Sequence, residues 1–464
     1  MTRRRRLRLA LAGTAVVAAL AAGPAAAAEA PQPGSPGLGD PFFPFAGNGG
    51  YDVKHYDLVL GYDPGTDVLD GLAVIKATAT QSLSRFDLDL RGFAISSVRV
   101  NGLAAIFTRD GQELVITPRM PLRKGATFLV TVAYRGIPDV VIDPDGSSEG
   151  WIPTSDGAFV VGEPQGSPGW FPANDNPRDK ATFGFTVTVP RGITAMANGR
   201  LIAKVNAPRG KTTWLWRSDD LMAPYLATST LGVFDLTISR VGRTPSYVAV
   251  DPSQAAASAE PLSKIPAMMA FFEQTFGPYP FSATGAIVDD APDVGYALET
   301  QTKANYHRAP PESTVAHEIA HEWFGNAVTL TVWPDIWLNE GFASYAETLW
   351  GEHTGQIDPQ AEFDAEFARP PTSSVWTIAP AALPGPQFLF ASSPYVRGGM
   401  TLHALRVKVG DPAFFRILRT WYARYRDGNV TTADFIALSE QVSGQDLGNF
   451  FDVWLYRPTK PTSW

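Results

Sequence analysis

The chain has 464 residues, a formal net charge of −8 and 45% hydrophobic residues. This length and composition suffice for two or three packed domains, which excludes a wholly disordered chain. The acidic balance disfavours binding to nucleic acid or to an anionic membrane surface. Because the sequence has no cysteine, disulfides and thiolate-bound metal are excluded as well.

Residues 1–28 have the pattern of an export signal. A basic start that includes Arg3 to Arg6 precedes an apolar run and small residues suited to cleavage near Ala28. The apolar run is shorter than the roughly 18 residues that a membrane-spanning helix needs, and no other stretch reaches that length. We therefore expect a secreted protein without a membrane span. The arginines leave general and twin-arginine export both open.

Residues 29–50 are rich in proline and glycine, which predicts a mostly disordered lead-in. From Tyr51 onward hydrophobic residues alternate with polar ones, for example over residues 56–62 and 183–189, as in half-buried strands. The pairs Asn101-Gly102 and Asn198-Gly199 suit tight turns between strands. Residues 51–235 are therefore expected to form an antiparallel β domain.

The pattern after residue 235 is mixed and then helical. Residues 246–250 and 285–290 are expected to be strands, and from Tyr395 onward apolar residues recur at helical spacing. Residues 236–464 are therefore expected to form a mainly helical domain with a small sheet. The predicted fold class is α+β.

The sequence HEIAH at residues 317–321 is the strongest chemical signal in the chain. His317 and His321 are four residues apart, so on a helix both imidazoles face the same side one turn apart. Pro310 and Pro311 precede this expected helix. H-E-x-x-H on a helix is typical of zinc peptidases, in which the intervening glutamate, here Glu318, serves as general base.

A third metal ligand is expected at Glu340, which lies nineteen residues after His321 in the helical pattern WLNEGFASYAE. Two antiparallel helices would bring this carboxylate to the imidazoles and leave the fourth position of a tetrahedral zinc open. Glu347 lies two turns further along the same helix face. It either accepts a hydrogen bond from a ligand imidazole or is a solvated helix charge, and the sequence leaves both open.

With these motifs the chain resembles the zinc aminopeptidase family that includes aminopeptidase N and leukotriene hydrolase, a branch of the gluzincins. The resemblance implies a saddle-like N-terminal β domain, a thermolysin-like catalytic domain and one Zn²⁺ per chain. Larger members continue into further C-terminal domains, which are expected to be absent here. The segments that carry the resemblance are HEIAHEWFGN, WLNEGFASYAE, GYALETQT, PYVRGG and WFPANDNPRDKATFGFTVTVP.

The resemblance also implies catalytic roles. His317, His321 and Glu340 match the family's zinc ligands, and Glu318 matches its general base. Tyr395 in PYVRGG matches a tyrosine whose hydroxyl stabilises the tetrahedral intermediate, a role that suits a phenol beside the metal.

Substrate binding is expected from two further segments. Glu299 matches the glutamate that binds the substrate's free α-amine in the family, and Ala297 lies in the same segment. Glu163 stands where relatives place a second amine-binding residue. From the residues alone, a charge on an edge strand is the favoured interpretation of Glu299, and for Glu163 a loop carboxylate is as well supported as a binding role.

Three residues depart from the family's motifs. Tyr296 and Thr300 replace a glycine and an asparagine on either side of Ala297 and Glu299, which leaves the details of substrate alignment open. Glu322 replaces a common glutamine, and the sequence gives no mechanistic interpretation of it.

The expected reaction is hydrolysis of the N-terminal bond of peptides with a free α-amine by a protein for which a monomer is favoured. A zinc endopeptidase would be favoured if Glu299 and Glu163 did not converge on the metal site. A non-catalytic exported binding module is disfavoured because both Glu318 and Tyr395 are present.

Overall fold

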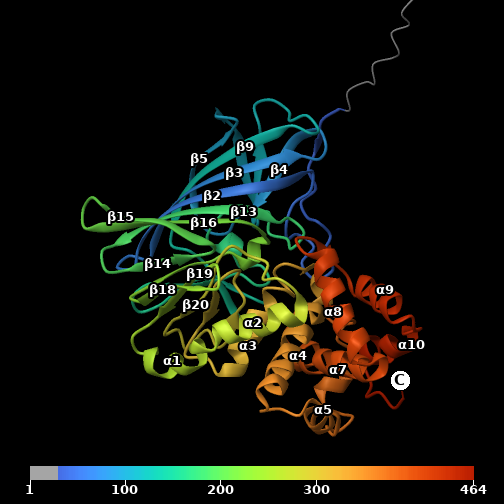
Figure 1. Ribbon diagram of the computed structural model, residues 1–464. Coiled ribbons are helices and arrows are strands. Elements are labelled where there is room, and N and C mark those ends of the chain that lie inside the picture. The colour runs from blue at the N-terminus through green and yellow to red at the C-terminus, as the bar shows by residue number, and fades with distance from the viewer. Residues whose placement is uncertain (1–29, 464) are drawn as a thin grey trace, which may run out of the picture. The chain divides into compact units, whose positions relative to one another are not determined.

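The computed structural model describes residues 30–463. The expected export signal at residues 1–28 lies outside the described residues and stays a prediction. Along the described chain a region of strands is followed by a region of helices with one further five-stranded sheet (Figure 1).

One eight-stranded sheet dominates the first region. Its strands pair antiparallel except for β2 and β13, which run parallel with Tyr56 opposite Phe183. The expectation of a wholly antiparallel domain is therefore wrong at this pair, because no short turn fixes the direction of strands so far apart in sequence. In sheet order the strands are β15 (Arg200–Ala207), β16 (Lys211–Met222), β13 (Ala181–Pro190), β2 (Tyr51–Asp63), β3 (Val68–Ala79), β9 (Thr127–Gly136), β5 (Ala94–Val100) and β6 (Leu103–Ala104).

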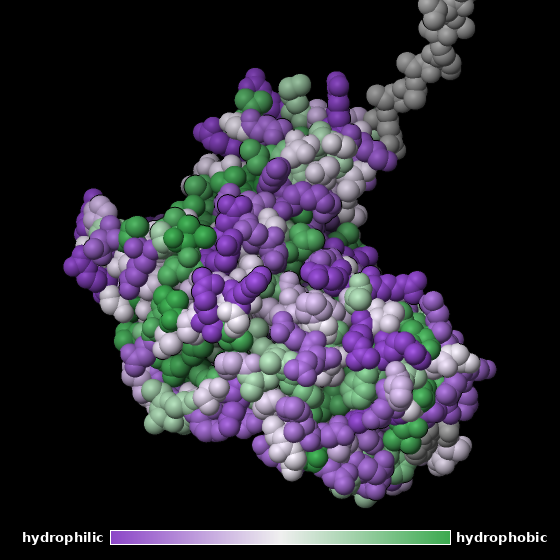
Figure 2. Space-filling view, in the orientation of Figure 1, coloured by the Kyte–Doolittle hydropathy of each residue, from purple (hydrophilic) through white to green (hydrophobic). Residues whose placement is uncertain are grey.

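Exposed apolar side chains such as Val59, Leu129 and Ile202 lie on strands of the large sheet, and Figure 2 shows hydrophobic patches over that area.

Two smaller sheets complete this region. The first smaller sheet contains β1 (Gln32–Pro33), β4 (Leu83–Asp89), β8 (Glu113–Thr117) and β7 (Ile106–Asp110). The second contains β10 (Val140–Ile142), β11 (Ser148–Pro153), β12 (Ala158–Val161), β17 (Ser229–Gly232) and β14 (Thr194–Ala197).

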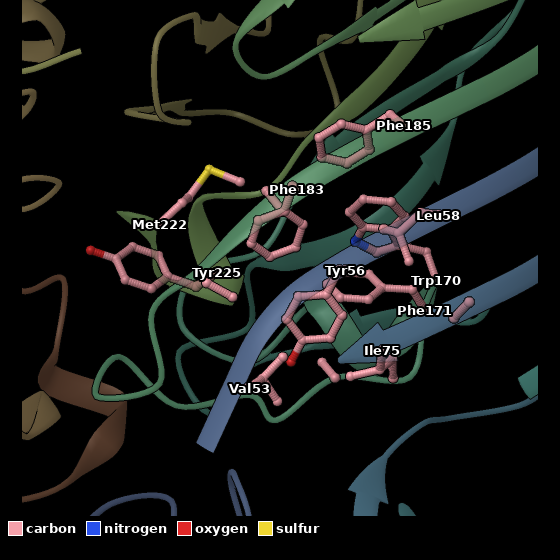
Figure 3. Packing of buried hydrophobic residues seen from close by; sticks show 14 of the residues in the cluster. Val53, Tyr56, Leu58, Ile75, Trp170, Phe171, Phe183, Phe185, Met222 and Tyr225 are labelled. Atoms are coloured by element: carbon pink, nitrogen blue, oxygen red, sulfur yellow. The ribbon is translucent and has the colours of Figure 1, made fainter. Parts of the chain in front are cut away.

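A cluster of packed aromatic rings holds the segment just before β13 in place. Tyr56 stacks on Phe183 with ring centroids 4.7 Å apart, and Phe171 meets Tyr56 edge to face at 5.6 Å (Figure 3). The Tyr56 hydroxyl accepts the backbone N–H of Asn174 at 2.9 Å. Burial of these rings therefore fixes the backbone just before β13 as well as filling the core.

The lead-in at residues 30–50 is ordered, so the expectation of disorder there is wrong. β1 pairs in parallel with β4, and Phe43 is buried in the core. The Asp40 carboxylate accepts the backbone N–H of Trp333 at 2.8 Å. The proline and glycine residues favour turns in this segment. The apolar contacts of Phe43 and the hydrogen bond of Asp40 hold those turns in place.

The second region begins at Asp235 with a five-stranded sheet in the order β18-β19-β20-β22-β21. These strands are β18 (Asp235–Val241), β19 (Thr244–Val250), β20 (Thr284–Val288), β22 (Ala304–Tyr306) and β21 (Ala297–Leu298). Two short strands, β23 (Thr329–Leu330) and β24 (Asn429–Val430), pair separately.

Helices make up most of the remainder, which confirms the α+β prediction. α3 packs against α4, and α4 packs against α7. No helix among residues 30–463 is long and apolar enough to cross a membrane. The helices are α1 (Ala255–Ser263), α2 (Ile265–Phe276), α3 (Glu312–His321), α4 (Trp337–Thr354), α5 (Pro359–Phe367), α6 (Ser374–Thr377), α7 (Gly398–Val409), α8 (Asp411–Tyr425), α9 (Thr432–Ser443) and α10 (Gly448–Phe451), with π-helical turns at η5 (Ser393–Arg397) and η6 (Asp452–Tyr456).

A buried lysine joins the two regions. The Lys180 ammonium donates to the backbone carbonyls of Asn326, Ala327 and Gly428 at 3.2, 3.0 and 3.1 Å. Burial lowers the pKa of Lys180 to about 7. The WFPANDNPRDK segment of the β region thus contacts the turn that directly follows α3.

Candidate active site

Two helices bring the predicted metal ligands together. α3 begins directly after Pro311 and carries His317 and His321 one turn apart, with ring centroids 4.7 Å apart. Glu340 in the first turn of α4 places Oε2 3.2 Å from His317 Nε2 and 3.5 Å from His321 Nε2. One possible ligand atom from each residue lies within 4.8 Å of the other two. The predicted set therefore converges on one point.

The remaining imidazole nitrogens are held by hydrogen bonds. His317 Nδ1 donates to Glu347 Oε1 at 2.8 Å, and His321 Nδ1 donates to the Phe324 carbonyl at 3.0 Å. These bonds place the protons on Nδ1 and direct both Nε2 atoms toward Glu340. Of the two possibilities for Glu347, the structure supports acceptance of a bond from a ligand imidazole.

The donor set fits a zinc ion. Two imidazole nitrogens and one carboxylate oxygen are the ligands of catalytic zinc with an open fourth position. Burial alone would raise the pKa of Glu340, but the imidazoles of His321 and His317 outweigh it and lower the pKa to about 2. Glu340 is therefore ionised, as a ligand must be.

Glu318 lies between the ligands on α3 and is buried. Its Oε2 has no hydrogen-bond partner among the described residues. Burial raises the pKa of Glu318 to about 8, although His317 and His321 act in the opposite direction. A buried carboxylate with a free oxygen and a pKa near neutrality has the properties of a general base.

Two further carboxylates lie beside Glu340 in the cleft. Glu299, which follows β21, and Glu163 are only 3% and 6% exposed. Carboxyl oxygens of Glu163, Glu299 and Glu340 lie within 4.8 Å of one another. Oε1 of Glu163 and Oε1 of Glu299 have no partner among the described residues, and burial raises the pKa of both groups. Buried carboxylates without partners are expensive unless a cation binds, and an ammonium group fits them.

Tyr395 lies on η5, at the start of the segment that leads into α7. Its ring lies nearly parallel to that of His317, with centroids 6.1 Å apart. Burial, followed by the charge of Glu340, raises the pKa of the Tyr395 hydroxyl well above its ordinary value, so the hydroxyl stays protonated as a donor. All the predicted site residues, Ala297 included, line one cleft of about 480 Å³.

Comparison with known proteins gives the same assignment. Residues 52–226 match the family model "Peptidase M1 N-terminal domain", and residues 294–454 match "Peptidase family M1 domain". The solved structure of an M1 zinc metallopeptidase from Deinococcus radiodurans, a mutant bound to a Tyr-Ser-Ala substrate, is 31% identical to this chain. Its TM-score is 0.85, and the match covers 92% of this chain and 98% of that one.

The chain belongs to peptidase family M1. Aminopeptidase N of Lactococcus lactis subsp. lactis is 27% identical over 327 residues, which cover 63% of this chain and 38% of that protein. Glutamyl aminopeptidase of Homo sapiens is 26% identical over 315 residues, which cover 61% of this chain and 32% of that protein. The matches thus span less than half of the length of these two M1 relatives.

Close packing of α4 against the start of α7 holds the turn that carries Tyr395 in this M1 chain. A Cβ atom on Gly341 of α4 would lie 2.8 Å from the Cα atom of Gly398, so the two glycines let α4 approach the start of α7. Arg397 is fully buried and donates to the backbone carbonyls of Trp454 and Trp376 at 2.8 and 3.0 Å. Arg397 fixes the turn that carries Tyr395. Its position inside the PYVRGG motif did not by itself predict this role.

Asn326 is a second residue that the sequence analysis missed. It ends the M1 segment HEIAHEWFGN, and its side-chain amide donates to the backbone carbonyl of Glu299 at 2.8 Å. The sequence signal that could have identified Asn326 is its position in the same motif as His317 and His321. Asn326 links the turn after α3 to the segment that carries Glu299.

Proposed function

We propose that this chain is a zinc-dependent aminopeptidase that hydrolyses the N-terminal bond of peptides with a free α-amine. The observation that carries the proposal is the convergence of Glu163 and Glu299 beside Glu340. A site for an ammonium group next to a metal site places only the first peptide bond at the reacting centre. The bound Tyr-Ser-Ala substrate of the Deinococcus radiodurans relative supports peptides as the substrate class.

His317, His321 and Glu340 would hold the zinc ion. When bound, zinc supplies a Lewis acid that polarises the scissile carbonyl and makes water more acidic. The hydrogen bonds from His317 to Glu347 and from His321 to Phe324 keep both imidazoles in the tautomer that this role needs.

Glu318 moves the proton of the reaction. Its Oε2, which has no partner in the described part of the chain, accepts a proton from the attacking water and passes it to the nitrogen of the leaving amine. The raised pKa of Glu318 makes its ionised carboxylate a stronger base than that of an exposed glutamate. Tyr395 donates its hydroxyl proton in a hydrogen bond to the oxyanion that forms on the carbonyl.

Glu299 and Glu163 position the substrate. Each offers a buried oxygen that has no partner within residues 30–463, and an ammonium group can donate to both. Positioning of this kind lowers the barrier because the reacting groups are already oriented. The condition that would favour a zinc endopeptidase, namely that these carboxylates do not converge, is not met.

Aminoacyl fluorogenic substrates test the proposal directly. We expect hydrolysis of substrates with a free α-amine, loss of activity with a chelator and recovery on addition of zinc. Absence of hydrolysis across a panel of first residues in zinc-loaded protein would contradict the proposal and favour a binding module.

We further propose that the protein is exported and acts as a monomer. The basic, apolar and small-residue pattern of residues 1–28 supports export. Protein recovered from the medium should begin near residue 29 by N-terminal sequencing. Light scattering should give the mass of one chain.

A further inference from the structure

A second cavity of about 330 Å³ adjoins the catalytic cleft and shares Glu347 and Tyr395 with it. It is lined by residues of α4, α5 and α7, which lie close together in Figure 1, and by residues of the turn η5. Glu163 and Glu299 line only the catalytic cleft. A peptide that begins at these two carboxylates therefore enters the second cavity only after it passes the metal site.

The cavity combines an apolar floor with an acidic rim. Phe363 and Met400 are buried and offer apolar surface. Glu362 and Glu366 on α5 add two carboxylates one helical turn apart. The lining contains no lysine or arginine among the residues that the structure describes. This combination suits a side chain with a long apolar stem and a positive end.

Glu362 is the carboxylate that is available for a new partner. It accepts a hydrogen bond from Thr348 Oγ1 at 2.8 Å, which orients it, and the described residues give it no ion pair with a basic side chain. Glu366, in contrast, is already paired with Arg369. His403 supplies no counter-charge, because burial and then Arg406 lower its pKa.

We propose that this cavity binds the side chain of a lysine or arginine located one or two residues after the cleaved bond. The inference rests on the proposed aminopeptidase function and names a class of substrate for it. The methylene stem packs on Phe363 and Met400, and the cationic end reaches Glu362. An acidic side chain at the same position is repelled by Glu362 and Glu347.

Two peptide series test this assignment, Ala-Xaa-Ala-amide and Ala-Ala-Xaa-amide, with lysine, norleucine or glutamate at Xaa. Norleucine keeps an apolar stem of similar length and lacks the charge. In at least one series we expect kcat/KM for lysine to exceed that for norleucine by about 3- to 10-fold, as for a partly exposed charge pair, with glutamate lowest. Low salt should widen the ratio.

Glu362→Gln keeps the shape and the bond from Thr348 but removes the charge. It should abolish the preference for lysine and leave the norleucine peptide unchanged. Glu260→Gln is the matched control, because Glu260 is an exposed glutamate on α1 that lines neither cavity. The control should keep the lysine preference of the wild type.

Binding without turnover gives an independent measure. In a Glu318→Gln background, calorimetry should show the lysine peptide binding about 3- to 10-fold more tightly than the norleucine peptide, and Glu362→Gln should remove that difference. Cleavage without a lysine preference in either series, or a preference that survives Glu362→Gln, overturns this inference alone. If no free-amine peptide is cleaved, the proposed function fails and this inference fails with it.

Discussion

The carboxylate of Glu322 accepts the backbone N–H of Thr302 at 2.8 Å. Glu322 directly follows His321, a proposed metal ligand, whereas Thr302 lies three residues after Glu299, the residue proposed to bind the substrate amine. Thr302 has φ +72°, a left-handed conformation that is unusual for a β-branched residue. The bond therefore connects the end of α3, the helix that carries His317 and His321, to a strained turn that follows Glu299.

Replacement of Glu322 tests this connection. Glu322→Leu leaves the buried Thr302 N–H unpaired, so we expect KM for free-amine substrates to rise by about 5-fold or more, with zinc content unchanged. Glu322→Gln keeps the acceptor oxygen and should restore a KM close to that of the wild type. Equal effects of leucine and glutamine, or no change with leucine, would show that the bond does not position the amine site.

Glu318→Gln tests the general base. Glutamine keeps the size of the side chain and removes the proton acceptor, so turnover should fall by about 100-fold or more while zinc stays bound. Metal analysis and kcat on the same preparation check this. A loss of zinc in proportion to activity would mean that Glu318 acts as a ligand or supports the fold.

Tyr395→Phe removes one hydrogen bond that matters mainly in the transition state. We expect kcat to fall by about 100-fold or more and KM to change little. Steady-state kinetics on one free-amine substrate separates the two constants. Unchanged kcat would leave Tyr395 with a packing role beside His317.

Asp179 gives a pH dependence of stability near the segment that joins the two regions. Burial raises the pKa of its carboxyl to about 8, and the carboxylate accepts the backbone N–H of Val53 at 3.0 Å. The pKa of this carboxyl is about 4 in the unfolded chain and about 8 in the folded protein. Between these pH values the folded state binds more protons than the unfolded state, so the contribution of Asp179 to stability falls as pH rises.

The asparagine side chain in Asp179→Asn cannot ionise, so the variant lacks this pH-dependent contribution to the free energy of unfolding. Denaturant unfolding at pH 5 and pH 8 should show the difference in unfolding free energy moving in favour of the variant at the higher pH. A constant offset from altered hydrogen bonding does not affect that trend. An identical difference at both pH values would contradict the raised pKa.

The metal site was predictable because its information is local. His317 and His321 are one helical turn apart, and Glu340 lies in the first turn of the next long helix, so packing of two predicted helices is enough to bring three ligands near one point. Glu347 was ambiguous because the choice between solvent and an imidazole depends on how α3 and α4 pack. The convergence of Glu163 and Glu299 was harder to predict from the sequence. Glu163 follows β12 and Glu299 follows β21, and these two segments meet only in the folded chain.

Other features of the fold depend on contacts that no short pattern encodes. Composition suggested disorder for residues 29–50, yet Asp40 binds the backbone of Trp333, which is far away in the sequence. Strand alternation located β2 and β13 but carried no information on their parallel pairing. Glu322 had no interpretation because its partner, Thr302, is identified only by the three-dimensional path of the chain.

The most direct measurement of the central claim compares free-amine and N-acetylated forms of one peptide with the wild type and with Glu299→Ala, at equal zinc content. A carboxylate that binds an ammonium group is worth about 1.5 to 3 kcal/mol, so the variant should lose about 10- to 150-fold in kcat/KM on the free-amine peptide. The wild type should strongly prefer the free-amine form, and the variant should lose most of that preference. Wild-type protein that cleaves the acetylated peptide as fast as the free one would contradict the aminopeptidase assignment and favour an endopeptidase.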